Sequence, residues 1–282
     1  MTHKAVDDLR GIADLVERAK SAQDFIEDKR GEIEEASRIR REAVADLAAN
    51  KTHAEIAEAL GITRARVGQI LKEGPPPERL FWGTGVLTVA VGEKLEGPKD
   101  ASGKPGPVVA KEDMQAYCAL TESVAPMGLT THYEVVQPPG FIRLNRENLV
   151  VICGPRLSPM VGQTLESDPV LAFAKDEAGW HLVDRKTEKT YRSPLDDDIP
   201  EDYGYLGRLP RPDSRGTFLY IAGIHAVGAP GVVHYLERNL AEVYREVKTK
   251  RFSTLIHCKF DPETREITAS ERVTPFYRHE GN

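Results

Sequence analysis

The sequence lacks the features of several large protein classes. It has three cysteines, Cys118, Cys153 and Cys258, and no CxxC pair, so neither a disulfide framework nor a zinc site is expected. No apolar run approaches the ~20 residues of a membrane span, and the N-terminus has no apolar signal core. The eight histidines are scattered, without an HExxH motif or a tight His/Cys/Asp cluster. We therefore predict a cytoplasmic protein without a membrane span, a metal or a cofactor.

Length and charge favour two domains with different partners. A chain of 282 residues is long enough for two domains. The net charge of −6 argues against a protein coated in positive charge. Residues 1–35 carry a net charge of −4, whereas residues 36–72 carry +3. A locally basic segment in an acidic chain is typical of a site-directed DNA reader, although ordinary surface charge would give the same number.

Residues 53–72, HAEIAEALGITRARVGQILK, fit a helix-turn-helix. Ala57 is small where two helices would cross, Gly61 falls in the turn, and Thr63 is a natural N-cap for the second helix. The apolar residues at spacings that pack one helix on the other are Ile56, Leu60, Ile62, Val67 and Ile70. Upstream, residues 38–48 predict a first helix, with Ala43, Val44 and Leu47 packed beneath the motif.

The remaining face of this motif carries side chains suited to DNA, namely Arg64, Arg66, Gln69 and Lys72. Arginine and glutamine have the fork geometry that matches guanine and adenine edges. The segment GITRARVGQI resembles the promoter-reading segment of bacterial sigma factors, where Gly-Val-Ser-Arg-x-Arg-Val-x-Gln-Ile is typical, and HAEIAEAL resembles the helix before it. The resemblance covers residues 38–73. It implies major-groove binding, with Arg64 and Gln69 near base edges and Arg66 near bases or phosphates; a helix-turn-helix used for protein contacts is the alternative.

Two departures from the sigma-factor pattern limit what the resemblance implies. Gly68 stands where a polar or basic residue is common, which weakens the recognition helix. No other segment resembles the parts of a sigma factor that melt promoters or bind polymerase. The chain is therefore not expected to be a complete sigma factor.

The segment before the motif, residues 4–48, is predicted to be helical. Its apolar residues follow a 3–4 alternation that Gln23 and Arg30 interrupt, and they are Leu9, Ile12, Val16, Ala19, Ile26 and Ile33. This pattern is typical of a short dimerising coiled coil, and equally of a helix packed on its own domain. A homodimer is one partner that the sequence leaves open.

A proline run marks the expected domain boundary. GPPPERL, residues 74–80, cannot continue a helix and favours a stiff spacer. We predict a helical DNA-binding region over 1–73, a linker over 74–80, and an α/β domain over 81–282 that senses a ligand or acts as an effector.

The larger region mixes strand and helix patterns. Strands are predicted at 86–94, 131–137, 149–153, 217–222, 252–260 and 266–277, with a hairpin around 180–191, and helices at 111–125 and 231–248. The apolar runs LVVIC and TFLYIA are typical of buried central strands. This alternation predicts a layered, Rossmann-like α/β sheet domain.

Two glycine-rich turns follow those apolar strands. LVVIC leads into Gly154, Arg156 and Ser158, and TFLYIA leads into Gly223, His225 and Gly228 before a helix. Glycines let backbone N–H groups approach a ligand, and a helix N-terminus attracts anions. We predict one anion or phosphate site built from these residues; the alternative is that the glycines merely permit tight turns.

Known nucleotide motifs are incomplete at these turns. Gly223 and Gly228 have Walker A spacing, but Ala229 and Pro230 replace the lysine and Ser/Thr, and no GxGxxG occurs. Ser158 has no nucleophile elbow around it. Farther along, Asp202, Tyr203 and Arg208 lie in a polar segment, residues 193–212. Asp202, beside the aromatic Tyr203, is a further candidate for binding a base or sugar.

The segments LVVICGPRLSP, YLGRLPRP and FLYIAGIHAVG resemble the large domain of uncharacterised bacterial helix-turn-helix regulators, which supports the domain pairing without giving a reaction. We therefore predict a transcription regulator that binds double-stranded DNA and senses a small anionic or nucleotide-like ligand. The alternatives are a nucleotide-processing enzyme located on DNA by its helix-turn-helix, and an interaction adaptor without a ligand.

Overall fold

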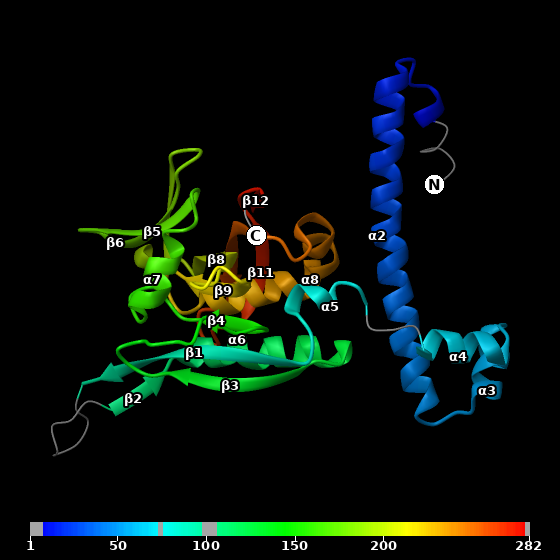
Figure 1. The fold of residues 1–282 in the computed structure, drawn as a ribbon, viewed down its shortest axis with the longest axis horizontal. Helices are drawn as coiled ribbons and strands as arrows, with labels where there is room; N and C mark the ends of the chain where they lie inside the picture. The colour runs from blue at the N-terminus through cyan, green and yellow to red at the C-terminus, as the bar shows by residue number, and fades with distance from the viewer. Residues whose placement is uncertain (1–7, 73–75, 98–105, 280–282) are drawn as a thin grey trace. The chain divides into compact units, whose positions relative to one another are not determined.

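The chain divides into two units, Met1–Pro76 and Pro77–Asn282, with a mixed α/β architecture. The computed structural model describes residues 8–72, 76–97 and 106–279 (Figure 1). Gly74 and Pro75 of the predicted linker lie outside the described residues. Residues 77–80 belong to the second unit, where Glu78 is buried and helix α5 (Arg79–Trp82) begins.

Within residues 8–72, the first unit includes helices α2, α3 and α4. Helix α2 (Leu15–Ala48) starts at Asp14, whose carboxylate accepts a hydrogen bond from the Glu17 amide at 2.8 Å. Helix α3 (His53–Leu60) has a capping box, in which the Thr52 hydroxyl accepts from the Glu55 amide and the Glu55 carboxylate accepts from the Thr52 amide. It ends at Gly61, whose φ of 62° suits glycine. Helix α4 (Arg64–Lys72) follows directly.

A small core joins these helices, formed by Val44, Ile56, Ala57, Val67 and Ile70. The sequence also predicted Leu60 and Ala43 for this core, and both predictions were wrong. Leu60 is 44% exposed, and Ala43 is exposed on α2. The core is small because α3 and α4 pack only on the C-terminal part of α2.

The second unit is built on a large mixed sheet with the order β11-β10-β8-β9-β4-β1, in which β3 and β2 both pair with β1. Its parallel strands are β1 (Val86–Glu96), β3 (Thr130–Val136), β4 (Leu149–Ile152) and β9 (Thr217–Gly223). Its antiparallel strands are β2 (Gly106–Val109), β8 (Glu201–Pro210), β10 (Phe252–Phe260), β11 (Ile267–Arg272) and β12 (Tyr277–Arg278). The antiparallel half departs from a fully parallel doubly wound sheet.

Different elements cover the two faces of this sheet (Figure 1). Helices α6 (Lys111–Val124) and α8 (Gly228–Val247) pack on one face, together with α5. The other face is covered by α7 (Pro159–Leu165) and a three-stranded sheet of β5 (Leu171–Asp176), β6 (Gly179–Asp184) and β7 (Lys189–Arg192). Two short 3₁₀ helices, Ala125–Met127 and Pro194–Asp197, complete the elements. Strand β4, which is buried along its whole length, lies between β1 and β9 at the centre.

Strand β8 lies within the polar segment 193–212, where no strand was predicted. Ten residues of that segment form a strand between β9 and β10, and most of them are buried. Its glycines allow close packing: a Cβ at Gly204 would lie 2.7 Å from the Gly228 carbonyl oxygen, and one at Gly207 would lie 2.5 Å from the Tyr205 hydroxyl. The buried Asp202 and Arg208 in the same strand hid the apolar pattern from the sequence analysis.

Candidate functional site

Helix α4 presents a polar surface opposite its buried side. Val67 and Ile70 face the core of the first unit, whereas Arg64, Gln69 and Lys72 are exposed. Arg66 is half-buried, and its Nη1 donates to the Gln69 Oε1 at 3.3 Å. This contact holds two fork-shaped side chains together on the exposed surface.

Two residues of α4 and its turn have distinct roles. Thr63 caps the helix, because its hydroxyl accepts a hydrogen bond from the Arg66 amide at 3.1 Å. A Cβ at Gly68 would meet no atom within 4 Å, so the glycine is not required by packing. The helix start is therefore well defined, while its middle carries a residue that favours helix weakly.

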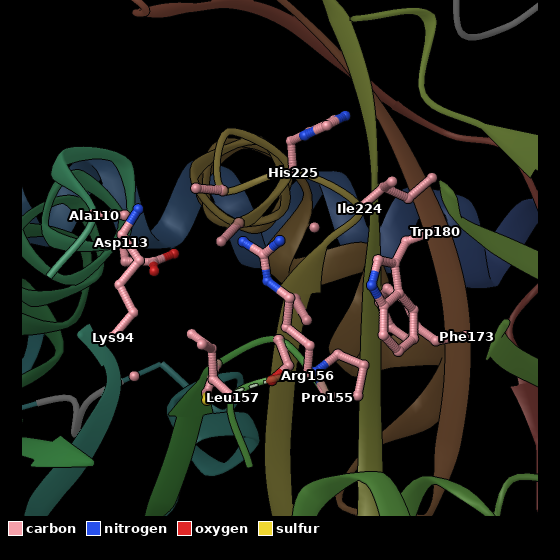
Figure 2. A pocket seen from close by; sticks show the side chains of 17 residues that line it. Lys94, Ala110, Asp113, Pro155, Arg156, Leu157, Phe173, Trp180, Ile224 and His225 are labelled. Atoms are coloured by element: carbon pink, nitrogen blue, oxygen red, sulfur yellow. Dashed lines mark hydrogen bonds between the residues drawn. The ribbon is translucent and has the colours of Figure 1, made fainter. Parts of the chain in front are cut away.

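A cavity lies at the carboxyl ends of the parallel strands β1, β4 and β9 (Figure 2). It is lined from β1, the first turn of α6, the loop after β4, strands β5 and β6, and the turn between β9 and α8. We call this cavity the crevice. In open α/β sheets ligands bind outside the carboxyl ends of the strands, where neighbouring connections diverge.

Four predicted residues line the crevice: Gly154, Arg156, Gly223 and His225. The guanidinium of Arg156 reaches its centre, whereas the imidazole of His225 is directed away from that guanidinium (Figure 2). The His225 Nε2 lies 2.8 Å from the Asp196 Oδ1, and the His225 amide donates to the Asp202 Oδ2 at 3.0 Å. His225 therefore contributes mainly to the shape of the turn.

Three predicted residues are not among those that line the crevice: Ser158, Asp202 and Gly228. Ser158 is buried, and its hydroxyl donates to the Gly140 carbonyl at 2.6 Å while capping α7. Asp202 is buried in β8, and burial raises the pKa of its carboxyl. A Cβ at Gly228 would lie 2.6 Å from the Gly223 Cα. These groups hold the turn and the loop rather than face the crevice.

Among the crevice residues that the sequence analysis missed are two charged and two aromatic side chains: Lys94, Asp113, Phe173 and Trp180. They come from β1, α6 and the β5–β6 hairpin, which lie far from the two glycine-rich turns in the sequence. Of these four residues, only Asp113 could have been suggested by its position in the sequence. It lies in the first turn of a predicted amphipathic helix that follows a predicted strand. Phe173 and Trp180 carried no such signal, because the hairpin packs on the sheet through tertiary contacts.

Asp113 is the principal titratable group of the crevice. Burial and the neighbouring Glu112 raise its pKa to about 7, although the positive charges of Arg156 and Lys94 oppose this rise. Figure 2 shows its carboxylate and the Arg156 guanidinium directed toward the same space. Near neutral pH the crevice therefore holds a fixed guanidinium beside a carboxyl group that exchanges its proton readily.

The described residues contain no cluster of three or more His, Cys, Asp or Glu side chains fit to hold a metal ion. Within the same residues, no helix is both long enough and apolar enough to cross a membrane. Comparisons with models of protein families, with curated proteins and with solved structures give no match for this chain. The functional argument therefore rests on the geometry of α4 and of the crevice.

Proposed function

We propose that this chain is a cytoplasmic transcription regulator whose first unit binds double-stranded DNA and whose second unit senses a small anionic ligand. The single observation that carries the proposal is helix α4. It has a capped start, a buried apolar side, and an exposed side bearing Arg64, Gln69 and Lys72. A short helix packed through one side and polar on the other suits insertion into the major groove.

The side chains of α4 divide by the contacts they suit. Arg64 and Gln69 match the hydrogen-bonding edges of guanine and adenine, while Lys72 suits a phosphate. Arg66 bridges to Gln69 and so orients its amide. Base contacts would give sequence preference, and the basic charge of residues 36–72 would supply salt-dependent affinity.

The DNA proposal is tested by gel shift on a site selected from random duplexes. Arg64→Ala should lower affinity for that site by about 1–3 kcal/mol and relax its sequence preference, since one bidentate base contact carries that much discrimination. Lys72→Ala should weaken all sequences equally. Lys20→Ala, an exposed basic residue of α2, is the matched control. Unchanged affinity in the Arg64→Ala/Gln69→Ala double variant would refute this reading surface.

The crevice supports the sensing half of the proposal. Arg156 and Lys94 supply positive charge, and helices α6 and α8 begin at its rim. The enclosed part, about 70 Å³, has room for one small anionic group. Trp180 and Phe173 line the adjoining wall, where the ring of a nucleotide-like ligand would pack.

The sensing half is tested by thermal shift with phosphate, carboxylates, sugar phosphates and nucleotides. A ligand that stabilises the native protein should lose its effect in Arg156→Ala, and the basal melting temperature should stay close to that of the wild type. Trp180→Leu should weaken nucleotides more than phosphate. No stabilising compound, together with a silent Arg156→Ala, would favour the adaptor function instead.

Regulation would arise through linkage. A ligand that prefers one state of the second unit shifts the population of chains competent to bind DNA, by as much as its affinities for the two states differ. DNA affinity measured with and without the stabilising ligand gives this coupling free energy. Equal affinities would remove the regulatory link and leave two independent binding functions.

One observation favours the enzyme alternative. A carboxyl group with a pKa of about 7 beside an arginine is suited to general acid–base catalysis on a bound phosphate ester or nucleotide. Release of product from nucleotides by the purified protein would support it. Asp113→Asn should then abolish turnover while the ligand still binds; a variant that retains turnover would exclude Asp113 as the catalytic group.

A further inference from the structure

A second cavity lies at the amino-terminal ends of β4 and β9, whereas the crevice lies at the carboxyl ends of the same strands. The second cavity is lined by α5, by the start of β4 and β9, and by the end of β8, all within the second unit. Its volume is about 410 Å³, which is in the range of small-molecule sites. Three arginines, Arg208, Arg211 and Arg215, line it, and Glu147 is the one acidic residue among the described residues that do so. We call it the arginine cavity.

Arg208 is a buried cation without a carboxylate partner among residues 8–72, 76–97 and 106–279. Its side chain is 8% exposed and packs over the Phe81 ring, with the guanidinium carbon 5.1 Å from the ring centroid. Nη2 donates to the Phe81 carbonyl, but Nε has no hydrogen-bond partner among the described residues. Burial alone lowers the pKa of Arg208 to about 10, so it remains charged at neutral pH. A buried, unpaired charge is costly unless an anion compensates it.

Other hydrogen-bond donors line the same cavity. Arg211 is held in place, because its Nη2 donates to the Arg215 carbonyl at 2.8 Å and its Nε lies 3.3 Å from the Asp213 Oδ1. Arg215 is exposed. Trp82 also lines the cavity, and its indole N–H is buried without an acceptor in the described part of the chain. The cavity therefore has several N–H donors and few acceptors.

We propose that the arginine cavity is a second anion-binding site, distinct from the crevice, that takes a small phosphate-bearing molecule. The planar guanidinium forks of Arg208 and Arg215 match phosphate oxygens in bidentate geometry. The charge favours an anion, since the three arginines exceed the two carboxylates beside them, Glu147 in the lining and Asp213 paired with Arg211, by one positive charge. A small molecule is favoured over a duplex backbone, because a duplex is too broad to reach into the cavity to Arg208, a residue that is 8% exposed.

Inorganic pyrophosphate is the probe, and the full-length Arg156→Ala variant is the background, so that binding in the crevice does not contribute. Titration calorimetry should show binding in this background. Adding Arg208→Met or Arg215→Ala should each weaken it about tenfold or more, since each removes a charge-assisted contact. Arg143→Ala, an exposed arginine that does not line the arginine cavity, is the matched control and should not change it.

Arg208→Met also has a readout without any ligand. Replacing an unpaired buried charge by an apolar side chain of similar length should raise the basal melting temperature while abolishing the pyrophosphate effect. If Arg208→Met fails to fold, Arg211→Ala and Arg215→Ala together give the same test at the mouth of the cavity. The proposal is overturned if pyrophosphate does not bind Arg156→Ala, or if these arginine variants bind it as tightly as the background. It is equally overturned if they lower duplex DNA affinity without changing pyrophosphate binding, which would assign the arginines to a DNA backbone.

Discussion

At the scale of single residues, the glycines of the β9–α8 turn serve packing. A Cβ at Gly228 would approach the Gly223 Cα to 2.6 Å and the Tyr203 carbonyl oxygen to 2.7 Å, and these backbone atoms cannot move aside cheaply. Sequence analysis predicted Gly228 as a ligand contact, on the reasoning that glycine lets a backbone approach an anion. The close approach observed is between β9 and α8 themselves.

Gly228→Val should therefore destabilise the protein by roughly 1–3 kcal/mol or more, through overpacking at the backbone rather than through loss of a ligand. Gly154→Ala is the matched control from the other turn. A Cβ there meets no atom within 4 Å, so its free energy of unfolding should stay within about 0.5 kcal/mol of the wild type. Urea denaturation measures both. A Gly228→Val protein as stable as Gly154→Ala would mean that the turn relaxes.

Asp113 should make the stability of the second unit depend on pH. Its pKa is raised from 3.8 to about 7, so below pH 3.8 the carboxyl is neutral in both the folded and the unfolded chain. Between about pH 4 and pH 7 only the unfolded chain ionises, and stability from this group is lost as the pH rises. Since one pKa unit corresponds to about 1.4 kcal/mol, the loss is at most about 4 kcal/mol.

Asp113→Asn tests this dependence. The free energy of unfolding of the wild type should fall relative to the variant from pH 5 to pH 8, and parallel curves would contradict the raised pKa. Anion affinity provides an independent measurement. Protonation of Asp113 removes a negative charge beside Arg156, so wild-type affinity for an anion in the crevice should increase toward pH 6, whereas Asp113→Asn should bind with little pH dependence.

At the scale of elements, the most unusual feature is the exposed apolar stripe on α2. Val16, Ile26 and Ile33 are 64%, 50% and 64% exposed, respectively, although their spacing is that of a packed stripe. The sequence left open whether this stripe packs on its own domain or on a second copy. These three side chains are exposed in the described part of the first unit, so a second copy remains one of the two ways to cover them.

We expect the protein to dimerise through α2. Ile26→Ser and Ile33→Ser together should convert the dimer to a monomer in sedimentation experiments at tens of micromolar, because they remove the apolar seam of a coiled coil. Ile39→Ser is the matched control: Ile39 is 54% exposed but lies off the stripe. A wild-type protein that sediments as a monomer, with and without DNA, would exclude this interface.

The elements that sequence analysis identified correctly include uniformly buried strands and long amphipathic helices. LVVIC and TFLYIA became β4 and β9, and the long amphipathic pattern after Gly228 became α8. Strand β8 was missed because Asp202 and Arg208 are buried within it, so its polar residues resemble those of a loop. Local pattern identifies strands whose apolar residues dominate, and it failed at β8, where a buried aspartate and a buried arginine interrupt the apolar residues.

The same distinction explains the crevice. Arg156 and Gly154 could be predicted because they directly follow a buried strand, and the residues after such a strand lie at its carboxyl end. Asp113 and Trp180 come from elements that no local rule connects to that strand. Their roles follow from the order β3-β1-β4-β9 and from the position of the β5–β6 hairpin, which are properties of the folded chain.

At the scale of the whole molecule, the start of the second unit is part of its core. Phe81 and Trp82 are buried on α5, and the Phe81 ring packs 6.0 Å from the Phe252 ring, centroid to centroid. The predicted linker, residues 74–80, therefore extends into a segment that the second unit needs.

A fragment beginning at Pro77 should fold, whereas one beginning at Thr84 should be severely destabilised. Loss of each buried aromatic costs about 3–5 kcal/mol, and Arg208 would also lose its acceptor at Phe81. Thermal unfolding followed by circular dichroism compares the two fragments with the full chain. Limited proteolysis should accordingly cut before Pro77 and not within α5. Equal melting temperatures for the two fragments would show that α5 is dispensable.

The alkylation rates of the three cysteine thiols report where this protein opens. Cys118 is exposed, whereas Cys153 and Cys258 are buried, and burial raises the pKa of Cys153 to about 12 and that of Cys258 well above its usual range. A thiol-reactive probe should therefore label Cys118 at once and the other two only when the protein opens. Cys153 lines the crevice and Cys258 does not. The ratio of their labelling rates thus separates opening of the crevice from opening of the whole unit.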